Sequence, residues 1–99
     1  MTYKEKDQLL RYIFNKRKQL LMYEKHICEK EYIEDSKEGL FLRWVQFAFN
    51  SCSKESRLIL EKEYICHERK DWWYIYYSRS TYYRFKQKAM DEFLDCLHE

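Results

Sequence analysis

Hydrophobic residues recur in pairs along the first third of the chain. Most gaps between the pairs are four or seven residues, so the pairs share one side of a helix. No glycine or proline interrupts residues 4–33. The pattern therefore predicts either one long helix or two helices with a joint near Asn15. The pairs are Leu9/Leu10, Ile13/Phe14, Leu20/Leu21 and Ile27/Cys28.

The middle of the chain predicts a linker followed by two shorter helices. Residues 34–39 are polar and contain the only glycine of the chain, so we expect them to form the linker. Apolar residues at helical spacing predict a helix from Leu40 to Asn50. Ser53 has a side chain suited to an N-cap, which predicts the start of a further helix over Lys54–Tyr64.

The last third contains an aromatic run and one strongly amphipathic segment. After a polar joint over residues 65–70, the run Asp71–Tyr77 predicts a short helix. Ser78 is a suitable N-cap, and the segment Arg79–Leu97 predicts the final helix. Its apolar residues recur at helical spacing and define one buried face. They are Tyr82, Phe85, Ala89, Met90, Phe93 and Leu97.

Composition agrees with an all-α class. The chain has 99 residues, 45% of them hydrophobic, with one glycine and no proline, so it has material for a core but few residues for tight turns. We expect a long N-terminal helix or bent helix pair over residues 1–35, packed on a helical domain over residues 40–99. No stretch of about 18 apolar residues occurs, and the N-terminus lacks the apolar segment of a signal peptide, so we expect a cytoplasmic protein without a membrane span.

The sequence offers little for catalysis or metal binding. The four cysteines contain no Cys-x-x-Cys pair, and we expect free thiols. His26, Cys28, Cys66 and His67 form an awkward set for one zinc ion, because Cys66 and His67 are adjacent. The same adjacency makes them a poor nucleophile–base pair. We expect no enzyme activity, no catalytic residue, no metal and no cofactor.

Charge is segregated within the final helix. Residues 78–88 contain four bases and no acid, namely Arg79, Arg84, Lys86 and Lys88, whereas residues 89–99 contain four acids and no base. With the apolar face inward, the exposed face mixes side chains that read bases with side chains that bind phosphate. This set comprises Arg79, Ser80, Tyr83, Arg84, Gln87 and Lys88, with Thr81 at its border.

The segment Ser78–Met90 resembles the recognition helix of bacterial sigma-factor region 4 and of the phage-type ArpU family of regulators. The shared pattern is Ser-Arg-Ser-Thr, a hydrophobe, basic residues, then Ala89 and Met90. Upstream, Ser53–Tyr64 looks like the first conserved helix of that region, so the resemblance covers residues 41–97. The large residues of Trp72–Tyr77 differ from the family, which usually has a small residue before the turn.

The resemblance implies a C-terminal helix-turn-helix and a DNA-binding transcriptional regulator that also works with RNA polymerase. A composition rich in residues with AT-rich codons fits a bacterial or phage source. Double-stranded DNA would be contacted in the major groove. Base contacts would come from Arg79, Ser80, Thr81, Tyr83 and Arg84, and backbone contacts from Gln87 and Lys88.

Two alternatives stay open at this point. The chain could be a protein-interaction module on a helix-turn-helix scaffold without DNA binding, with Trp72, Trp73 and Tyr76 as the partner surface. The amphipathic N-terminal helix must also bury its apolar stripe. We expect it to fold back over Trp72–Tyr77 and give a monomer; pairing with its copy in a homodimer is the alternative.

Overall fold

The computed structural model describes residues 1–26, 37–66 and 69–98. Every regular element in this part of the chain is helical, which confirms the predicted all-α class. The 3₁₀ turn and the π-helical segment are labelled η. The elements are α1 (Tyr3–His26), α3 (Lys37–Ser51), α4 (Lys54–Leu60), the π-helical η1 (Glu61–Ile65), the 3₁₀ turn η2 (Trp72–Ile75) and α5 (Arg79–Leu97).

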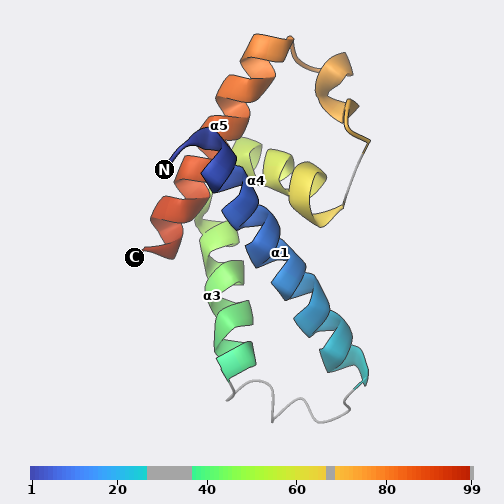
Figure 1. Ribbon diagram of the computed structural model, residues 1–99, viewed down its shortest axis with the longest axis vertical. Coiled ribbons are helices and arrows are strands. Elements are labelled where there is room, and N and C mark those ends of the chain that lie inside the picture. Colours follow the sequence, from blue (N-terminus) through green and yellow to red (C-terminus); the bar gives the residue numbers. More distant parts are fainter. Residues whose placement is uncertain (27–36, 67–68, 99) are drawn as a thin grey trace.

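In the described part of the chain, four α-helices enclose one core. Helices α1 and α3 lie side by side in the lower half of Figure 1, and α5 runs from the top of the view to their upper ends. Helix α4 packs against α5 and continues directly into η1. The turn η2 lies apart from this bundle, beside the N-terminal end of α5.

The core combines aliphatic side chains with three aromatic rings. Leu10, Ile59 and Phe93 are fully buried. The ring of Phe14 packs between Phe93 and Tyr64, with centroid distances of 5.1 Å and 5.7 Å. Since burying one large apolar side chain contributes about 1.5–3 kcal/mol, this cluster from α1, α4, η1 and α5 supplies much of the folding free energy.

Both predicted serine caps are confirmed. The hydroxyl of Ser53 accepts from the N–H of Ser56 at 3.3 Å, and the hydroxyl of Ser78 accepts from the N–H of Thr81 at 3.3 Å. Glu92 of α5 strengthens the first cap, because it accepts from the Ser56 hydroxyl at 2.7 Å and from the N–H of Ser53. The start of α4 is thereby tied to the middle of α5.

Several element boundaries differ from the prediction. The N-terminal helix passes Asn15 without a break, so the single-helix alternative holds as far as His26. Residues 37–39, expected in the linker, form the first turn of α3, while residues 27–36 lie outside the described part. The predicted helix Asp71–Tyr77 shrinks to one 3₁₀ turn over Trp72–Ile75.

The expectation that the N-terminal helix covers the aromatic run is wrong for the tip of η2. Tyr74, Ile75 and Tyr76 are 76%, 84% and 71% exposed. Helix α1 instead uses its apolar side against α3, η1 and α5. Trp72 and Trp73 are half-buried because both pack on Tyr82 of α5, Trp73 as a stacked pair at 4.7 Å.

Candidate nucleic-acid interface

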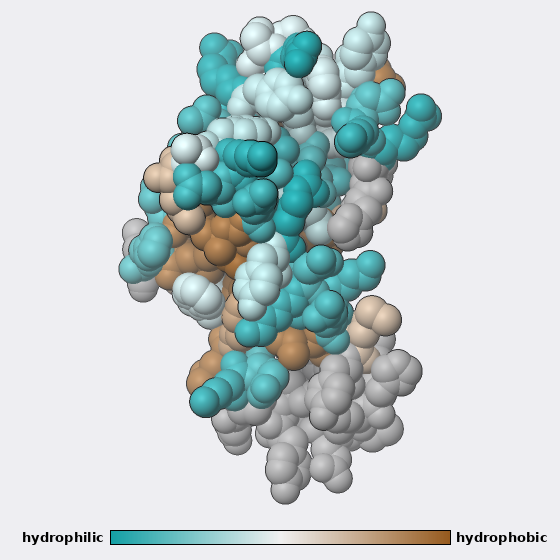
Figure 2. Space-filling view, viewed as in Figure 1, coloured by the Kyte–Doolittle hydropathy of each residue, from teal (hydrophilic) through white to brown (hydrophobic). Residues whose placement is uncertain are grey.

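Helix α5 presents most of the predicted DNA-binding residues to solvent. Ser80, Arg84, Gln87 and Lys88 are exposed, and their spacing of four, three and one residues places them on one face. Arg79 is exposed in the first turn of the helix. Ten consecutive residues from Arg79 contain no acid, so nothing within this part of the helix neutralises the face. Figure 2 shows hydrophilic residues gathered over the upper half of the molecule, where the N-terminal half of α5 lies.

Four of the predicted base-reading residues have contacts within the chain: Arg79 lies over the Tyr83 ring at 6.0 Å and Arg84 over the Phe85 ring at 5.5 Å, and Thr81 and Tyr83 are more firmly held. The hydroxyl of Thr81 accepts from the Ser78 hydroxyl at 2.8 Å, and Thr81 is half-buried. The ring of Tyr83 packs edge-on against Tyr82 at 5.3 Å and against Tyr3 of α1 at 6.1 Å. Thr81 and Tyr83 therefore border the exposed face and hold the start of α5 in place.

Lys86 does not belong to the surface, although the sequence groups it with the basic block. It is only 6% exposed, since it lies on the same side of α5 as Tyr82 and Met90. Its ammonium group lies 3.3 Å from Asp7 of α1 and 3.7 Å from Glu63 of η1. The basic block thus divides into three exposed bases and one structural base.

The two carboxylates beside Lys86 also accept hydrogen bonds from side chains of other elements. Glu63 accepts hydrogen bonds from the Trp72 indole N–H at 2.8 Å and from the Tyr82 hydroxyl. Asp7 accepts from the Tyr64 hydroxyl at 2.6 Å and from Arg11 at 3.0 Å. This polar network links α1, η1, η2 and α5, and it positions the first turns of α5 relative to the core.

Opposing effects set the pKa values within this network. Burial raises the pKa of Asp7, but hydrogen bonds from Tyr64 and Arg11 and the charge of Lys86 outweigh burial and leave the pKa below its ordinary value. Burial lowers the pKa of Lys86, but nearby Tyr3 and the charges of Glu63 and Asp7 outweigh it and raise the pKa. The network is therefore held in its ionised form at neutral pH.

The predicted partner surface lies on a different side of α5. Trp73 of η2 packs on Tyr82 and Tyr83, whereas the polar face runs through Ser80 and Arg84. A hollow of about 290 Å³ lies beside Trp72 and Tyr76. Tyr83 lies where the two surfaces meet, because it borders the polar face and its ring contacts Trp73.

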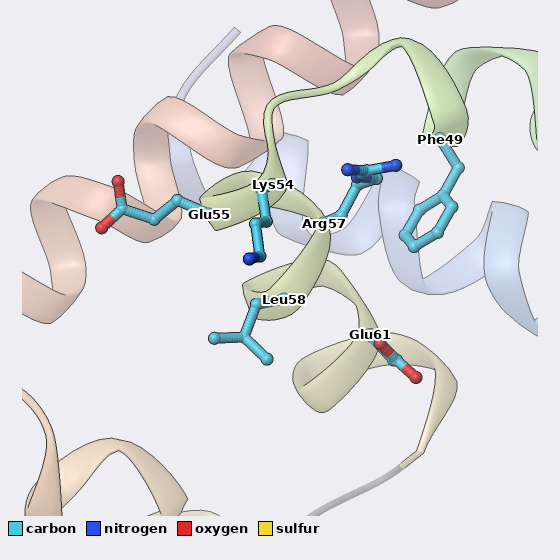
Figure 3. Close-up of a pocket in the computed structure, with 6 residues that line it drawn as sticks. All are labelled: Phe49, Lys54, Glu55, Arg57, Leu58 and Glu61. Atoms are coloured by element: carbon cyan, nitrogen blue, oxygen red, sulfur yellow. The ribbon is translucent and has the colours of Figure 1, made fainter.

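A second concavity lies along α4. Figure 3 shows the side chains that line it, which come from α4, from Glu61 of η1 and from Phe49 of α3. The groove has a volume of about 640 Å³ and is mainly apolar, with Leu58 43% exposed between Lys54 and Glu61. Its lining carries both signs of charge, so it lacks the uniformly basic character of the α5 face. The sequence gives no signal for this groove, because Leu58, Ile59 and Leu60 are consecutive and their pattern does not decide which side of the helix is buried.

The cysteines agree with the free thiols expected from the sequence. Cys52, Cys66 and Cys96 are free, and burial together with the neighbouring Cys96 raises the pKa of Cys52 to about 12. Cys28 and His67 lie outside the described residues. Within residues 1–26, 37–66 and 69–98, no three potential ligands cluster as a metal site would need. The helices described there are too short or too polar to cross a membrane.

Comparison with known proteins adds no relative to this picture. No family model matches the chain, and neither a curated protein nor a solved structure matches it.

Proposed function

We propose that the chain is a DNA-binding transcriptional regulator that inserts the N-terminal half of α5 into the major groove of duplex DNA. The observation that carries this proposal is the exposed, acid-free face formed by Arg79, Ser80, Arg84, Gln87 and Lys88. The major groove admits an α-helix, and arginine and glutamine form paired hydrogen bonds with guanine and adenine.

The roles follow from position along the helix. Arg79, Ser80 and Arg84 lie nearest the helix N-terminus, and we assign them to base contacts, with Thr81 and Tyr83 supporting them from the border of the face. Gln87 and Lys88 lie one turn further along and contact the DNA backbone. The free N–H groups and positive dipole end of α5 favour a phosphate near Ser78.

In this proposal η2 and α5 act as the two helices of a sigma region 4-like helix-turn-helix, and RNA polymerase is a further partner. The first of these helices is reduced to a single turn. Its attachment to the core through Trp72 and Glu63 would compensate for the missing length. The acidic residues of α5 lie toward its other end, and the first of them, Asp91, pairs with Lys6 of α1.

One observation favours the alternative of a protein-interaction module. Tyr74, Ile75 and Tyr76 together form an exposed apolar tip of a kind that soluble monomers rarely leave uncovered. Under this alternative the chain would bind purified RNA polymerase or another protein through η2, and it would not bind duplex DNA even at low salt.

Fluorescence anisotropy with a labelled random-sequence duplex tests the proposal. We expect affinity to fall steeply as salt rises from about 50 to 200 mM, because binding releases counterions from phosphates. The double variant Arg79→Ala/Arg84→Ala should lose affinity, because it removes two positive charges from the face that docks on the duplex. The control Lys16→Ala/Lys18→Ala removes the same charge from exposed positions of α1.

The control separates specific docking from general attraction. We expect it to keep most of the affinity. No binding by the unmodified chain at about 50 mM salt would overturn the proposal. An equal loss in both double variants would also overturn it, because net charge alone would then explain binding.

A further inference from the structure

The C-terminal ends of α3 and α5 bring two cysteines to one region of the fold. Cys52 follows α3 directly and is 4% exposed, and Cys96 lies half-buried in the last turn of α5. Cys52 belongs to the core, and Cys96 packs against that core. The two helices contact each other near the C-terminus of the chain (Figure 1). Neither thiol belongs to the proposed DNA-binding face.

Two hydrogen bonds between the α3 region and α5 set the positions of these cysteines. The Trp44 indole N–H donates to the Leu97 carbonyl at 2.9 Å, and the N–H of Ser53 donates to the Glu92 carboxylate. The later residue of the α3 region contacts the earlier residue of α5, so the two segments run antiparallel. The stretches between these contacts lie side by side, and each contains one cysteine.

The two cysteine side chains lean toward each other. The Cys52 thiol donates to the carbonyl of Ala48 at 3.3 Å, so it points back along α3. Side chains of an α-helix tilt toward its N-terminus, so Cys96 leans toward the turn that contains Glu92. In an antiparallel pair these two directions converge. Burial, together with the neighbouring Cys96 thiol, raises the pKa of Cys52 to about 12, which agrees with this arrangement.

We propose that Cys52 and Cys96 form a reversible disulfide that ties the end of α3 to the last turn of α5. The oxidant is a small-molecule disulfide such as oxidised glutathione. The Cys96 thiolate attacks one sulfur of the oxidant, forms a mixed disulfide and releases one glutathione thiolate. The Cys52 sulfur then attacks the Cys96 sulfur, loses its proton to solvent and displaces the second glutathione thiolate. Two protein thiols are oxidised, and one glutathione disulfide is reduced to two thiols.

The order of these steps follows from exposure. Cys96 is half-buried, whereas Cys52 is buried and its raised pKa keeps it protonated at neutral pH. An oxidant from solvent therefore meets Cys96 first. Once the mixed disulfide has formed, the second step takes place within one chain, which favours it over attack by a free thiol.

The disulfide should stabilise the C-terminal half of α5. It closes a loop from residue 52 to residue 96 and thereby restricts the unfolded chain. We expect the melting temperature of the oxidised chain to rise by about 10 °C or more. Residues 79–88 lie earlier on α5, so this proposal does not depend on DNA binding.

Peptide mapping of the full chain after incubation with oxidised glutathione tests the linkage. The protein is kept dilute, and the remaining free thiols are blocked with iodoacetamide before digestion. Trypsin cleaves after lysine and arginine, so the two cysteines lie in the separate peptides 44–54 and 89–99. We expect a linked species with the summed mass of these peptides less two hydrogen atoms, and dithiothreitol should release both.

Two serine variants separate this pair from general thiol reactivity. Cys96→Ser should lose both the linked species and the rise in melting temperature. Cys66→Ser, which removes the exposed thiol after η1, should keep both. A mixed disulfide that persists on Cys96 without linkage to peptide 44–54 would overturn the proposal, as would linkage of Cys96 to Cys28 or Cys66 instead. A linked chain that melts below the reduced chain would also overturn it, because the native helices would then not accommodate disulfide geometry.

Discussion

The two halves of α5 share one continuous helix but face different surroundings. Residues 79–88 present polar and basic side chains to solvent on one face. Residues 89–97 bury five side chains against α3, α4 and α1. Two of their three acids have structural partners, since Asp91 pairs with Lys6 and Glu92 caps α4. The C-terminal half therefore anchors the helix, and the N-terminal half is available for binding.

Lys86 and Lys88 differ in burial although they are close in the sequence. They lie two residues apart in the same basic block, yet Lys86 is buried between two carboxylates and Lys88 is exposed. A step of two residues turns an α-helix by about 200°, which places the two ammonium groups on opposite sides. The phase of the helix, rather than the local density of charge, decides which base contributes to stability and which is free for a ligand.

The largest difference between the two lysines should appear in folding stability. Lys86→Met keeps the length of the side chain but leaves Asp7 and Glu63 without their buried cation. Removing one partner of a buried ion pair costs about 3–5 kcal/mol in the free energy of unfolding. Lys88→Met, at the exposed position, should change it by less than about 0.5 kcal/mol.

Urea unfolding followed by circular dichroism measures both variants. Equal stability of Lys86→Met and Lys88→Met would mean that the network around Lys86 contributes nothing net, and that both lysines belong to the surface.

A smaller effect should appear as acid sensitivity. The pKa of Asp7 is below its ordinary value of 3.8 in the folded chain, so its interactions stabilise the fold above that value. This contribution is lost as pH falls through the still lower folded pKa. The Asp7→Asn variant should therefore be less stable than the unmodified chain at pH 7. The difference between their free energies of unfolding should become smaller as the pH is lowered below about 4.

Glu55 supplies a matched control for this measurement. It is an exposed acid in the first turn of α4, and Glu55→Gln should give only a small change at either pH. The difference in the free energy of unfolding between Asp7→Asn and the unmodified chain could instead stay constant from pH 7 to pH 3. That result would show that the charge of Asp7 is not the source of its contribution to stability.

Local signals made α5 predictable from the sequence. Its periodic apolar residues and the cap at Ser78 are encoded within twenty consecutive positions, and the structure reproduces the predicted bounds Arg79–Leu97. The exposure of Arg84, Gln87 and Lys88 follows from the same helical phase. The structure confirms that these residues are exposed, while their contact with DNA stays a prediction.

Long-range contacts explain what the sequence could not predict. Lys86 is buried because Asp7 and Glu63 approach it from other elements. The residues around Lys86 in the sequence do not predict these partners. Ile75 is likewise exposed because α1 packs on α3, η1 and α5 and does not cover the aromatic run. Amphipathic spacing shows that α1 must bury one side, but it does not specify the surface that receives it.

The difference between the two halves of α5 can be tested most directly by a titration of the ¹⁵N-labelled chain with duplex DNA, followed by the backbone amide signals in NMR spectra. Protein concentration is held constant so that self-association does not contribute. We expect the largest shifts and broadening over Arg79–Lys88, with little change over Ala89–Leu97. Shifts confined to η2, to α3 or to the groove along α4, with residues 79–88 unmoved, would contradict the assignment of DNA binding to the exposed half of α5.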